Sequence, residues 1–497
     1  MPARSQDVKG TGQTLRAASV AVAPFPAGDL LGTLCIRMEK LKKISDHAAM
    51  KLQNQLAILR RIREDGPITR VDLKEKTRLS WGTVTTSTKE LLDRGIITEI
   101  GSVSTGVGRR PVELDLNRED NFVLGLQLGS LLARAVLMDV KGTVVDELEV
   151  PVNARGTSEE ILACLQETGR TILHRHSVSK KRLAGVGIAA PGAVDFSTGV
   201  CFYAPHHPHL KDIPLKRHFE QAFGVPCFVD HDYNCFVLSE QLFGHGRGMD
   251  SFLCVLVGNG LSVGIVLHGE VYRGADSLAG EFGHTCIDED GPVCACGNKG
   301  CLEALASGSA IAATAQRELD RVAGGSLLAS SGRGNVSRIT AETVAAAARE
   351  GDALARGIYE RMGAVLGIGI SNLINIFNPQ CVILGGRVSK ASDLFVPSCL
   401  ETVKRRAWYS STKDVKVSRL ERGEVLGAAA LVLQQIFSTG QIVSRAEGNG
   451  RKTRSLGKAR QREAVSRRPT KSTKKLNARS ITPPKRLEER PAVQPRS

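Results

Sequence analysis

Residues 281–304 read EFGHTCIDEDGPVCACGNKGCLEA, a stretch that places three cysteines within eight positions, downstream of a histidine. One imidazole and three thiolates form a ligand set that suits tetrahedral Zn²⁺, and four protein ligands would close the shell and make the metal structural. The alternative is a group of reduced, buried cysteines beside an unrelated histidine, but the C-x-C-x4-C spacing with glycines at the turns favours a metal. The predicted zinc ligands are His284, Cys294, Cys296 and Cys301.

The bulk composition is that of a globular protein with more than one domain. The chain has 497 residues, of which 42% are hydrophobic, and twelve are cysteines. No signal peptide is recognisable, so we expect a reducing, cytoplasmic environment in which clustered cysteines bind metal. No apolar run approaches the roughly 20 residues that span a bilayer, and membrane insertion is not expected.

The positive charge is concentrated at one end of the chain. The net charge is +16, and residues 441–497 alone hold 17 Lys and Arg against 4 Asp and Glu. Residues 438–497 also lack apolar periodicity, so we expect a disordered basic tail. Such a tail is either a solvated linker or a source of nonspecific, salt-sensitive affinity for DNA.

The N-terminal part predicts a winged helix-turn-helix. Residues 1–50 show little periodicity and are interpreted as a flexible leader, within which Met38 is an alternative start. Apolar residues recur at helical spacing from Leu52 until Gly66-Pro67 ends the pattern. Thr69 and Asp72 have capping-box spacing, and Ser80 can cap a second helix that Gly95 ends. Two alternating segments then predict a two-stranded wing, which gives a DNA-binding domain over residues 51–118.

The second of these helices has the composition of a recognition helix. Val84 and Leu91 would face inward, while short polar side chains and a lysine would face DNA. The alternative is a small helical hairpin that contacts protein. The predicted DNA-binding residues are Trp81, Thr83, Thr85, Thr86 and Lys89 on the helix, and Arg109 and Arg110 in the wing.

Residues 119–437 have an α/β pattern that occurs twice. Strand-like segments, hairpins and capped helices alternate from Asn121 to "CVILGG" (381–386). We therefore expect two lobes, over residues 119–250 and 251–437.

These features together resemble the ROK family (repressors, open reading frames, kinases) from about Asn54 to Phe437. The histidine that follows E-x-G and the loop C-x-C-G-x-x-G-C-x-E form the family's diagnostic motif, which Glu281–Glu303 reproduces in full. The N-terminal winged helix with "GRRP" in its wing resembles the repressor branch, which includes xylose and N-acetylglucosamine repressors. The resemblance implies an actin-like, two-lobed ATPase fold with sugar bound between the lobes.

The resemblance also implies roles for individual residues. Asp232 corresponds by position to the catalytic base of the kinases, and it follows His231, where kinases usually carry Asn. His284 would bind metal through one ring nitrogen and a sugar hydroxyl through the other. The sugar-binding residues implied are His231, Asp232, Glu281, His284 and Glu303.

The two phosphate loops depart from the kinase pattern. Gln127 stands where family kinases place an Asp that holds hydrated Mg²⁺, and a neutral amide cannot offset the charge of the metal. Asn259 and Ser262 replace the Thr and Gly favoured in the second loop. Gly385-Gly386 fits a nucleotide site or a simple strand-to-helix turn. ATP and Mg²⁺ are therefore not expected as cofactors, and Asp232 would be catalytic only if kinase activity persists.

The sequence predicts a sugar-responsive transcriptional regulator, and more specifically a repressor of carbohydrate genes. A homodimer or homotetramer would bind palindromic operator DNA, and a sugar or phosphosugar in the cleft would change the spacing of its DNA-binding heads. One alternative is an ATP-dependent sugar kinase that keeps a DNA-binding head. The other is a regulator whose signal is a partner such as a sugar-transport protein.

Overall fold

The computed structural model describes the protein at residues 49–102, 111–204, 207–319, 328, 339–408 and 414–439. All of these residues fall within one compact unit. The expected leader, the basic tail, Arg109 and Arg110 lie outside the described residues.

The winged helix-turn-helix predicted from the sequence is confirmed. A helix over residues 49–65 is followed by β1 (Ile68–Thr69), α2 (Arg70–Thr77), α3 (Trp81–Asp93), β2 (Ile97–Ser102) and β3 (Val112–Leu116). Thr69 and Asp72 form the predicted capping box on α2, and the Ser80 hydroxyl accepts a hydrogen bond from the Thr83 amide at the start of α3. The two wing strands pair antiparallel, and β1 adds a short third strand that the sequence did not indicate.

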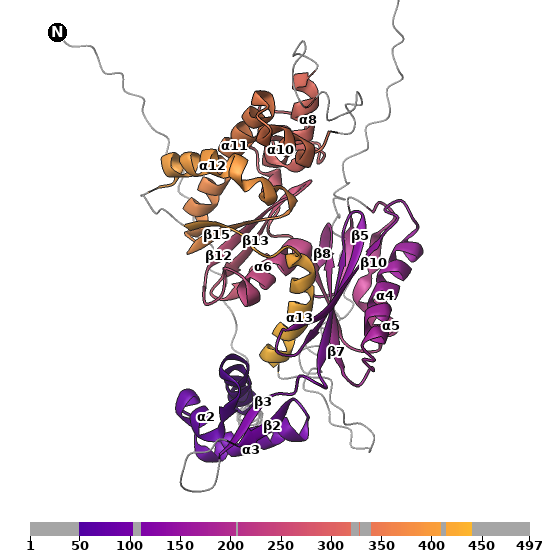
Figure 1. Ribbon diagram of the computed structural model, residues 1–497, viewed down its shortest axis with the longest axis vertical. Coiled ribbons are helices and arrows are strands. Elements are labelled where there is room, and N and C mark those ends of the chain that lie inside the picture. Colours follow the sequence, from indigo (N-terminus) through magenta and orange to yellow (C-terminus); the bar gives the residue numbers. More distant parts are fainter. Residues whose placement is uncertain are drawn as a thin grey trace, which may run out of the picture. The chain divides into compact units, whose positions relative to one another are not determined.

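The first lobe is a five-stranded sheet of order β11-β7-β4-β5-β6. Figure 1 shows α4 and α5 on one face of this sheet and α13 on the other. The main elements are β4 (Phe122–Leu128), β5 (Leu132–Asp139), β6 (Val144–Pro151), α4 (Ser158–Arg175), β7 (Leu183–Ala190), α5 (Leu215–Phe223) and β11 (Cys227–His231). A small antiparallel sheet adds β8 (Ala193–Asp195), β9 (Val200–Tyr203) and β10 (Lys211–Pro214). Strands β5 and β6 pair antiparallel as a hairpin that turns at Lys141-Gly142.

The second lobe repeats this architecture with a five-stranded sheet of order β14-β13-β12-β15-β16. Its strands are β12 (Phe252–Val257), β13 (Leu261–Leu267), β14 (Glu270–Val271), β15 (Cys381–Gly385) and β16 (Asp414–Val417). Its helices are α7 (Leu302–Ala306), α8 (Gly308–Leu319), α10 (Ala341–Arg349), α11 (Ala353–Phe377) and α12 (Ser392–Arg406), and α6 (Asp232–Phe243) and α13 (Gly423–Thr439) lie between the sheets. The expected α/β fold with two lobes is confirmed.

Helix α13 packs against its neighbours at backbone distance. A Cβ atom on Gly427 would lie 1.6 Å from the Cys235 carbonyl oxygen of α6, and one on Gly187 of β7 would lie 1.8 Å from the Ala428 carbonyl oxygen. Only glycine permits such approaches, so these positions fix the distance between α13, α6 and the sheet.

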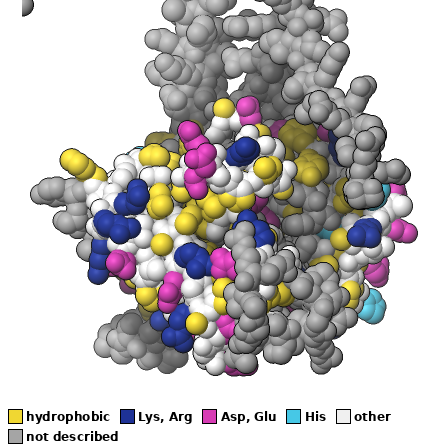
Figure 2. All heavy atoms as spheres, turned by 90° about the horizontal axis from the view of Figure 1, so that it is seen from above, with side chains coloured by type: hydrophobic (Ala, Val, Ile, Leu, Met, Phe, Trp, Pro, Cys, Tyr) yellow, Lys and Arg dark blue, Asp and Glu magenta, His cyan; other side chains and the backbone are white. Residues whose placement is uncertain are grey.

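Charged side chains of both signs are interspersed on the face that Figure 2 presents, with hydrophobic side chains between them. This face therefore does not carry the basic excess. Within the described ranges, no helix has the length and apolar character needed to cross a membrane.

A pair of glycine-to-alanine substitutions tests the packing of α13. Gly427→Ala should lower the free energy of unfolding by about 3 kcal/mol, because its methyl group meets backbone that cannot move aside. Gly357→Ala on α11 is the matched control, since its Cβ would approach only the flexible end of Arg361, and the higher helix propensity of Ala should leave stability equal or raised. Urea unfolding of both variants measures the difference, and equal stabilities would contradict the packing described.

Candidate functional site

A cleft of about 1770 Å³ lies between the two lobes. The end of β4, the start of α6, the loop of residues 281–303 and the start of α13 contribute to its wall. Of the residues predicted to bind sugar, Asp232, Glu281, His284 and Glu303 line this cleft. The structure therefore brings together four of the five.

The predicted metal ligands meet at one point beside the cleft. Nδ1 of His284 lies 3.7 Å from Sγ of Cys294, and Sγ of Cys296 lies 3.7 Å from Sγ of Cys301. All four ligand atoms lie within 4.8 Å of one another. A tetrahedral zinc ion with Zn–S bonds of about 2.3 Å would hold its sulfur ligands about 3.8 Å apart. The cluster is therefore of the right size to hold a tetrahedral metal ion.

Backbone hydrogen bonds hold the ligand loop in this arrangement. The Cys294 amide donates to the Asn298 carbonyl oxygen at 2.7 Å, and the Leu302 amide donates to the Thr285 carbonyl oxygen at 2.9 Å. Gly300 has φ of +66°, and a Cβ there would lie 1.5 Å from the Asp288 carbonyl oxygen. The glycine turns in the motif thus have a steric reason.

His284 connects the cluster to the cleft. While Nδ1 faces the cysteines, Nε2 lies 3.8 Å from Oε2 of Glu281, and about a third of the side chain (35%) is exposed. Glu303 is fixed by the Leu261 amide, which donates to its Oε2 at 3.0 Å. A Cβ on Gly260 would lie 2.6 Å from that oxygen, so this carboxylate requires a glycine beside it. Two carboxylates and an imidazole therefore converge on the cleft, as hydroxyl recognition requires.

Asp232, the first residue of α6, lies in an unusual electrostatic environment. Burial, together with the neighbouring carboxyl groups of Glu424 and Glu281, raises the pKa of Asp232 to about 7. Burial also raises the pKa of Glu424, the second residue of α13. A carboxyl group with a pKa near neutrality can accept or donate a hydrogen bond at physiological pH.

His231 is the predicted sugar ligand that does not line the cleft. Its side chain is fully buried, its Nε2–H donates to the Ser277 carbonyl oxygen at 3.0 Å, and its ring stacks on Tyr233. Burial lowers the pKa of His231 and favours its neutral form. Its contacts in the structure position the loop that precedes Glu281, and direct contact with sugar stays a prediction.

Gln127 is engaged by an arginine at the place where kinases hold their metal. Its side chain is buried, and Oε1 accepts a hydrogen bond from Nη1 of Arg134, its partner across the β4–β5 pair, at 3.2 Å. Arg134 also donates to Glu149 of β6 at 2.8 Å. Arg422, just before α13, pairs with Glu149 and Glu147. A guanidinium thus lies beside Gln127, where the sequence comparison with family kinases leads one to expect a carboxylate.

The turn at residues 258–260, in the segment that the resemblance compares with a second phosphate loop, is closed by backbone hydrogen bonds. The Gly258 amide donates to the Gly260 carbonyl oxygen at 2.9 Å, and the Gly308 amide at the start of α8 donates to the Gly258 carbonyl oxygen at 2.7 Å. Asn259 and Ser262 line the cleft in this turn.

Helix α3 presents the face that its spacing predicts. Val84 and Leu91 are buried, whereas Trp81 is 50% exposed. Thr85, Thr86 and Lys89 are exposed, and Thr83 is half-buried. The structure thus leaves these side chains available for DNA.

Arg70 of α2 fixes α3 against the wing. Its Nε donates to the buried Thr88 hydroxyl of α3 at 3.1 Å, and its Nη2 donates to Glu99 of β2 at 3.0 Å. The recognition helix and the wing are therefore held together as one unit.

Among the cleft-lining residues that sequence reasoning did not single out are Glu424 and Arg134. Glu424 lies in a long apolar segment where no motif marks it, and only the fold brings it near Asp232. Arg134 is seven residues from Gln127, a separation that reveals contact only once the β4–β5 register is known. An acidic residue at the start of an otherwise apolar helix was the one available signal.

Comparisons with known proteins agree with this geometry. Residues 123–435 match the model of the ROK family, and residues 52–98 match a model described as winged helix-turn-helix DNA-binding. A putative xylose repressor from Caldicellulosiruptor sp. (strain Rt8B.4) is 33% identical over 398 residues, which cover 80% of this chain and 99% of the relative. The DNA-binding transcriptional dual regulator NagC of Escherichia coli K12 is 31% identical over 392 residues, covering 78% and 94%.

The solved structures with a similar fold include members of the ROK family. A ROK family transcriptional regulator described as a homologue of the E. coli MLC protein superposes with a TM-score of 0.69 and 30% identity, covering 78% of this chain and 97% of its own. A ROK family glucokinase from Streptomyces griseus, in complex with glucose and AMPPNP, gives a TM-score of 0.57 and 29% identity, covering 63% of this chain and all of its own.

The raised pKa of Asp232 predicts how stability depends on pH. The folded chain keeps the proton of Asp232 up to about pH 7, whereas an unfolded aspartate loses it near pH 4. The stability that comes from the protonated Asp232 is therefore fully present below pH 4 and is lost progressively as the pH rises to about 7. The total loss in the free energy of unfolding is roughly 4 kcal/mol. Asp232→Asn should remove that slope and be more stable than the wild type at pH 8.

Urea unfolding at pH 5 and pH 8 measures this difference, and Asp276→Asn, at an exposed aspartate, is the control. A wild type and an Asp232→Asn variant with parallel pH profiles would show that the pKa of Asp232 is not raised.

Proposed function

The chain belongs to the ROK family, and from this membership and the geometry of the cleft we propose that it is a sugar-responsive transcriptional regulator, acting as a repressor of carbohydrate genes. One observation carries the proposal: the same compact unit holds an exposed recognition helix and a cleft in which carboxylates face a histidine. In this proposal residues 51–118 bind DNA and residues 119–437 bind the effector.

The effector would be a sugar or a phosphosugar. Glu281, Glu303 and Asp232 supply hydrogen-bond acceptors for hydroxyl groups, and Nε2 of His284 supplies a further polar contact. One relative is named as a putative xylose repressor, which supports a sugar as the class of ligand. A sugar in the cleft contacts both lobes and can shift their relative position only as far as it binds one arrangement better than another.

A kinase is the second candidate, and the cleft argues against it. Phosphoryl transfer needs Mg²⁺ to neutralise charge on the transferred group. Gln127 contributes no charge, and the Arg134 guanidinium beside it repels a divalent cation. Asp232 lies where the family's catalytic base would meet a sugar hydroxyl. Without phosphoryl transfer, its proposed role is to bind that hydroxyl.

The four-ligand cluster is proposed to hold structural Zn²⁺. Three thiolates and one imidazole favour this metal, and a closed shell leaves no position for a reactive water. When bound, zinc would supply a cross-link within a loop whose residues are largely exposed. His284 and Glu303 would then be held in place on the cleft wall.

On the DNA side, the proposed partner is a palindromic operator bound by a symmetric homodimer or homotetramer. The exposed face of α3 would enter the major groove, with the wing arginines Arg109 and Arg110 at the backbone or in the minor groove. A sugar-transport protein stays a candidate as a second partner.

A lysine substitution tests the DNA-binding face. Lys89→Ala should weaken binding to DNA selected from a random pool by the wild type, and should reduce the slope of log K against log salt by about one, because one phosphate contact is lost. Lys404→Ala, an exposed lysine on α12, is the matched control. Fluorescence anisotropy over a salt series measures both, and equal slopes for the two variants would show that α3 does not face phosphate.

The metal content tests the cluster. Purified protein should contain about one zinc per chain, and Cys301→Ser should lose the metal and unfold at a lower temperature. Cys286→Ser, at an exposed cysteine outside the cluster, should keep both the metal and the stability. Elemental analysis with thermal denaturation decides, and a metal-free wild type of unchanged stability would rule the site out.

An assay for sugar phosphate separates regulator from kinase. With ATP, Mg²⁺ and D-glucose, D-xylose or N-acetyl-D-glucosamine, we expect no phosphorylated product, while calorimetry should detect binding of at least one sugar. Asp232→Asn should weaken that binding. Sugar phosphate that forms in the wild type and disappears in Asp232→Asn would favour the kinase.

A further inference from the structure

The β5–β6 hairpin contacts the cleft at one end and the winged helix at the other. Leu131, Leu132 and Arg134 line the cleft, and the turn at Lys141 lies against the DNA-binding domain. From Arg134 the strand β5 runs to Asp139, a span of about 17 Å, and Lys141 lies in the turn that follows. The proposed regulation needs a structural element that reaches both sites.

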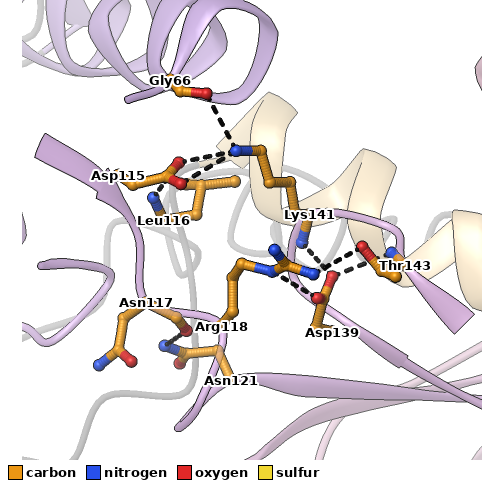
Figure 3. A network of polar contacts seen from close by, with 9 residues as sticks. All are labelled: Gly66, Asp115, Leu116, Asn117, Arg118, Asn121, Asp139, Lys141 and Thr143. Atoms are coloured by element: carbon orange, nitrogen blue, oxygen red, sulfur yellow. Dashed lines mark hydrogen bonds and ion pairs between the residues drawn. The ribbon is translucent and has the colours of Figure 1, made fainter. Parts of the chain in front are cut away.

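At the turn, one lysine binds two parts of the winged helix-turn-helix at once (Figure 3). Nζ of Lys141 donates to the carboxylate of Asp115 on β3 at 2.9 and 3.1 Å, and to the Gly66 carbonyl oxygen at the end of the first helix at 3.1 Å. The side chains of Lys141 and Asp115 are only 24% and 11% exposed, so solvent screens this pair less than a surface ion pair.

The turn itself is held rigid by Asp139. Its Oδ1 accepts hydrogen bonds from the Lys141 and Thr143 amides, both at 2.9 Å. Its Oδ2 accepts from Nε of Arg118, in the segment that joins the wing to β4, at 2.7 Å. The hairpin, the wing and the linking segment therefore form one hydrogen-bonded network.

At the cleft end, the hairpin is bonded to β4 and to the segment that precedes α13. Arg134 connects Gln127 of β4 to Glu149 of β6, and Arg422 connects Glu149 and Glu147 to the segment that begins α13. Between the two ends, β5 pairs with β4 and β6 along its length. The side chains of Val136 and Met138 on β5, and of Val140 just after it, belong to the same hydrophobic core as Leu114 and Leu116 of the wing.

We propose that the β5–β6 hairpin couples the cleft to the DNA-binding domain alongside α13, with Arg134 as the cleft anchor of the hairpin and Lys141 as its wing anchor. This inference rests on the proposed function, because it names the route by which an effector in the cleft reaches the DNA-reading elements. Lys141 is a positioning residue that touches neither sugar nor DNA. Coupling through the hairpin is tested by measuring whether a substitution at one end changes the structure at the other end.

Hydrogen exchange in the full chain supplies that measurement without sugar or DNA. Arg134→Met removes the cleft anchor and should raise the exchange rates of the amides of residues 112–116 about fivefold, although the substitution lies at the far end of the hairpin. Lys141→Met should raise the same rates directly. In the double variant the rates should match those of Lys141→Met alone, because the route is already broken.

Arg361→Met is the matched control, since it removes an arginine–carboxylate pair with Glu318 in the second lobe. It should leave exchange at residues 112–116 unchanged. Unchanged exchange in Arg134→Met, or fully additive effects in the double variant, would overturn the proposal. Because no ligand takes part, failure here is distinguishable from a failure of the proposed function, which would appear as absent DNA or sugar binding with the exchange pattern intact.

Discussion

The contact between helices α6 and α13 at Gly427 is the constraint on which the rest of the structure depends. There the two backbones approach so closely that a Cβ would lie 1.6 Å from the Cys235 carbonyl oxygen. Helix α6 begins at Asp232 and α13 begins beside Glu424, so the contact places two carboxyl groups at the same point of the cleft. The other end of α13 reaches the first helix, where the Arg63 guanidinium lies 4.6 Å from the centre of the Phe437 ring. Close packing leaves α13 little freedom to move independently of either end.

The charged groups that line the cleft are better suited to binding a sugar than to transferring phosphate. The acidic groups and His284 on one side are suited to hydroxyl groups, and an adjacent cluster of four metal ligands can fix that wall. On the other side, where a kinase must neutralise phosphate with a metal, a neutral Gln127 is bonded to Arg134. The fold shared with a glucokinase therefore does not require the activity of a glucokinase. In the proposed regulator, the free energy of sugar binding shifts the arrangement of the lobes.

The sequence alone located the helices of the DNA-binding domain and the metal-ligand motif. The cleft residues that it did not indicate were missed for physical reasons. The caps at Thr69 and Ser80 are local, so residue spacing alone located the helices. The motif from Glu281 to Glu303 is also local, and its ligands meet as the spacing predicts. By contrast, Glu424 and Arg134 reach the cleft through packing between distant segments, which periodicity does not encode. His231 lies beside Asp232 in the sequence, but its ring is fully buried and bonded to the Ser277 carbonyl oxygen, so its contact with sugar stays a prediction.

In the proposed regulator, occupancy of the cleft controls affinity for DNA. The most direct measurement is the dissociation constant of the chain for DNA that it selects from a random pool, determined while a panel of free sugars and sugar phosphates is titrated in turn. We expect at least one of these compounds to change the dissociation constant about tenfold. The affinity of the same compound for the chain should change by the same factor when DNA is present, because the coupling is reciprocal. DNA affinity that stays constant for every compound that binds the cleft would contradict it.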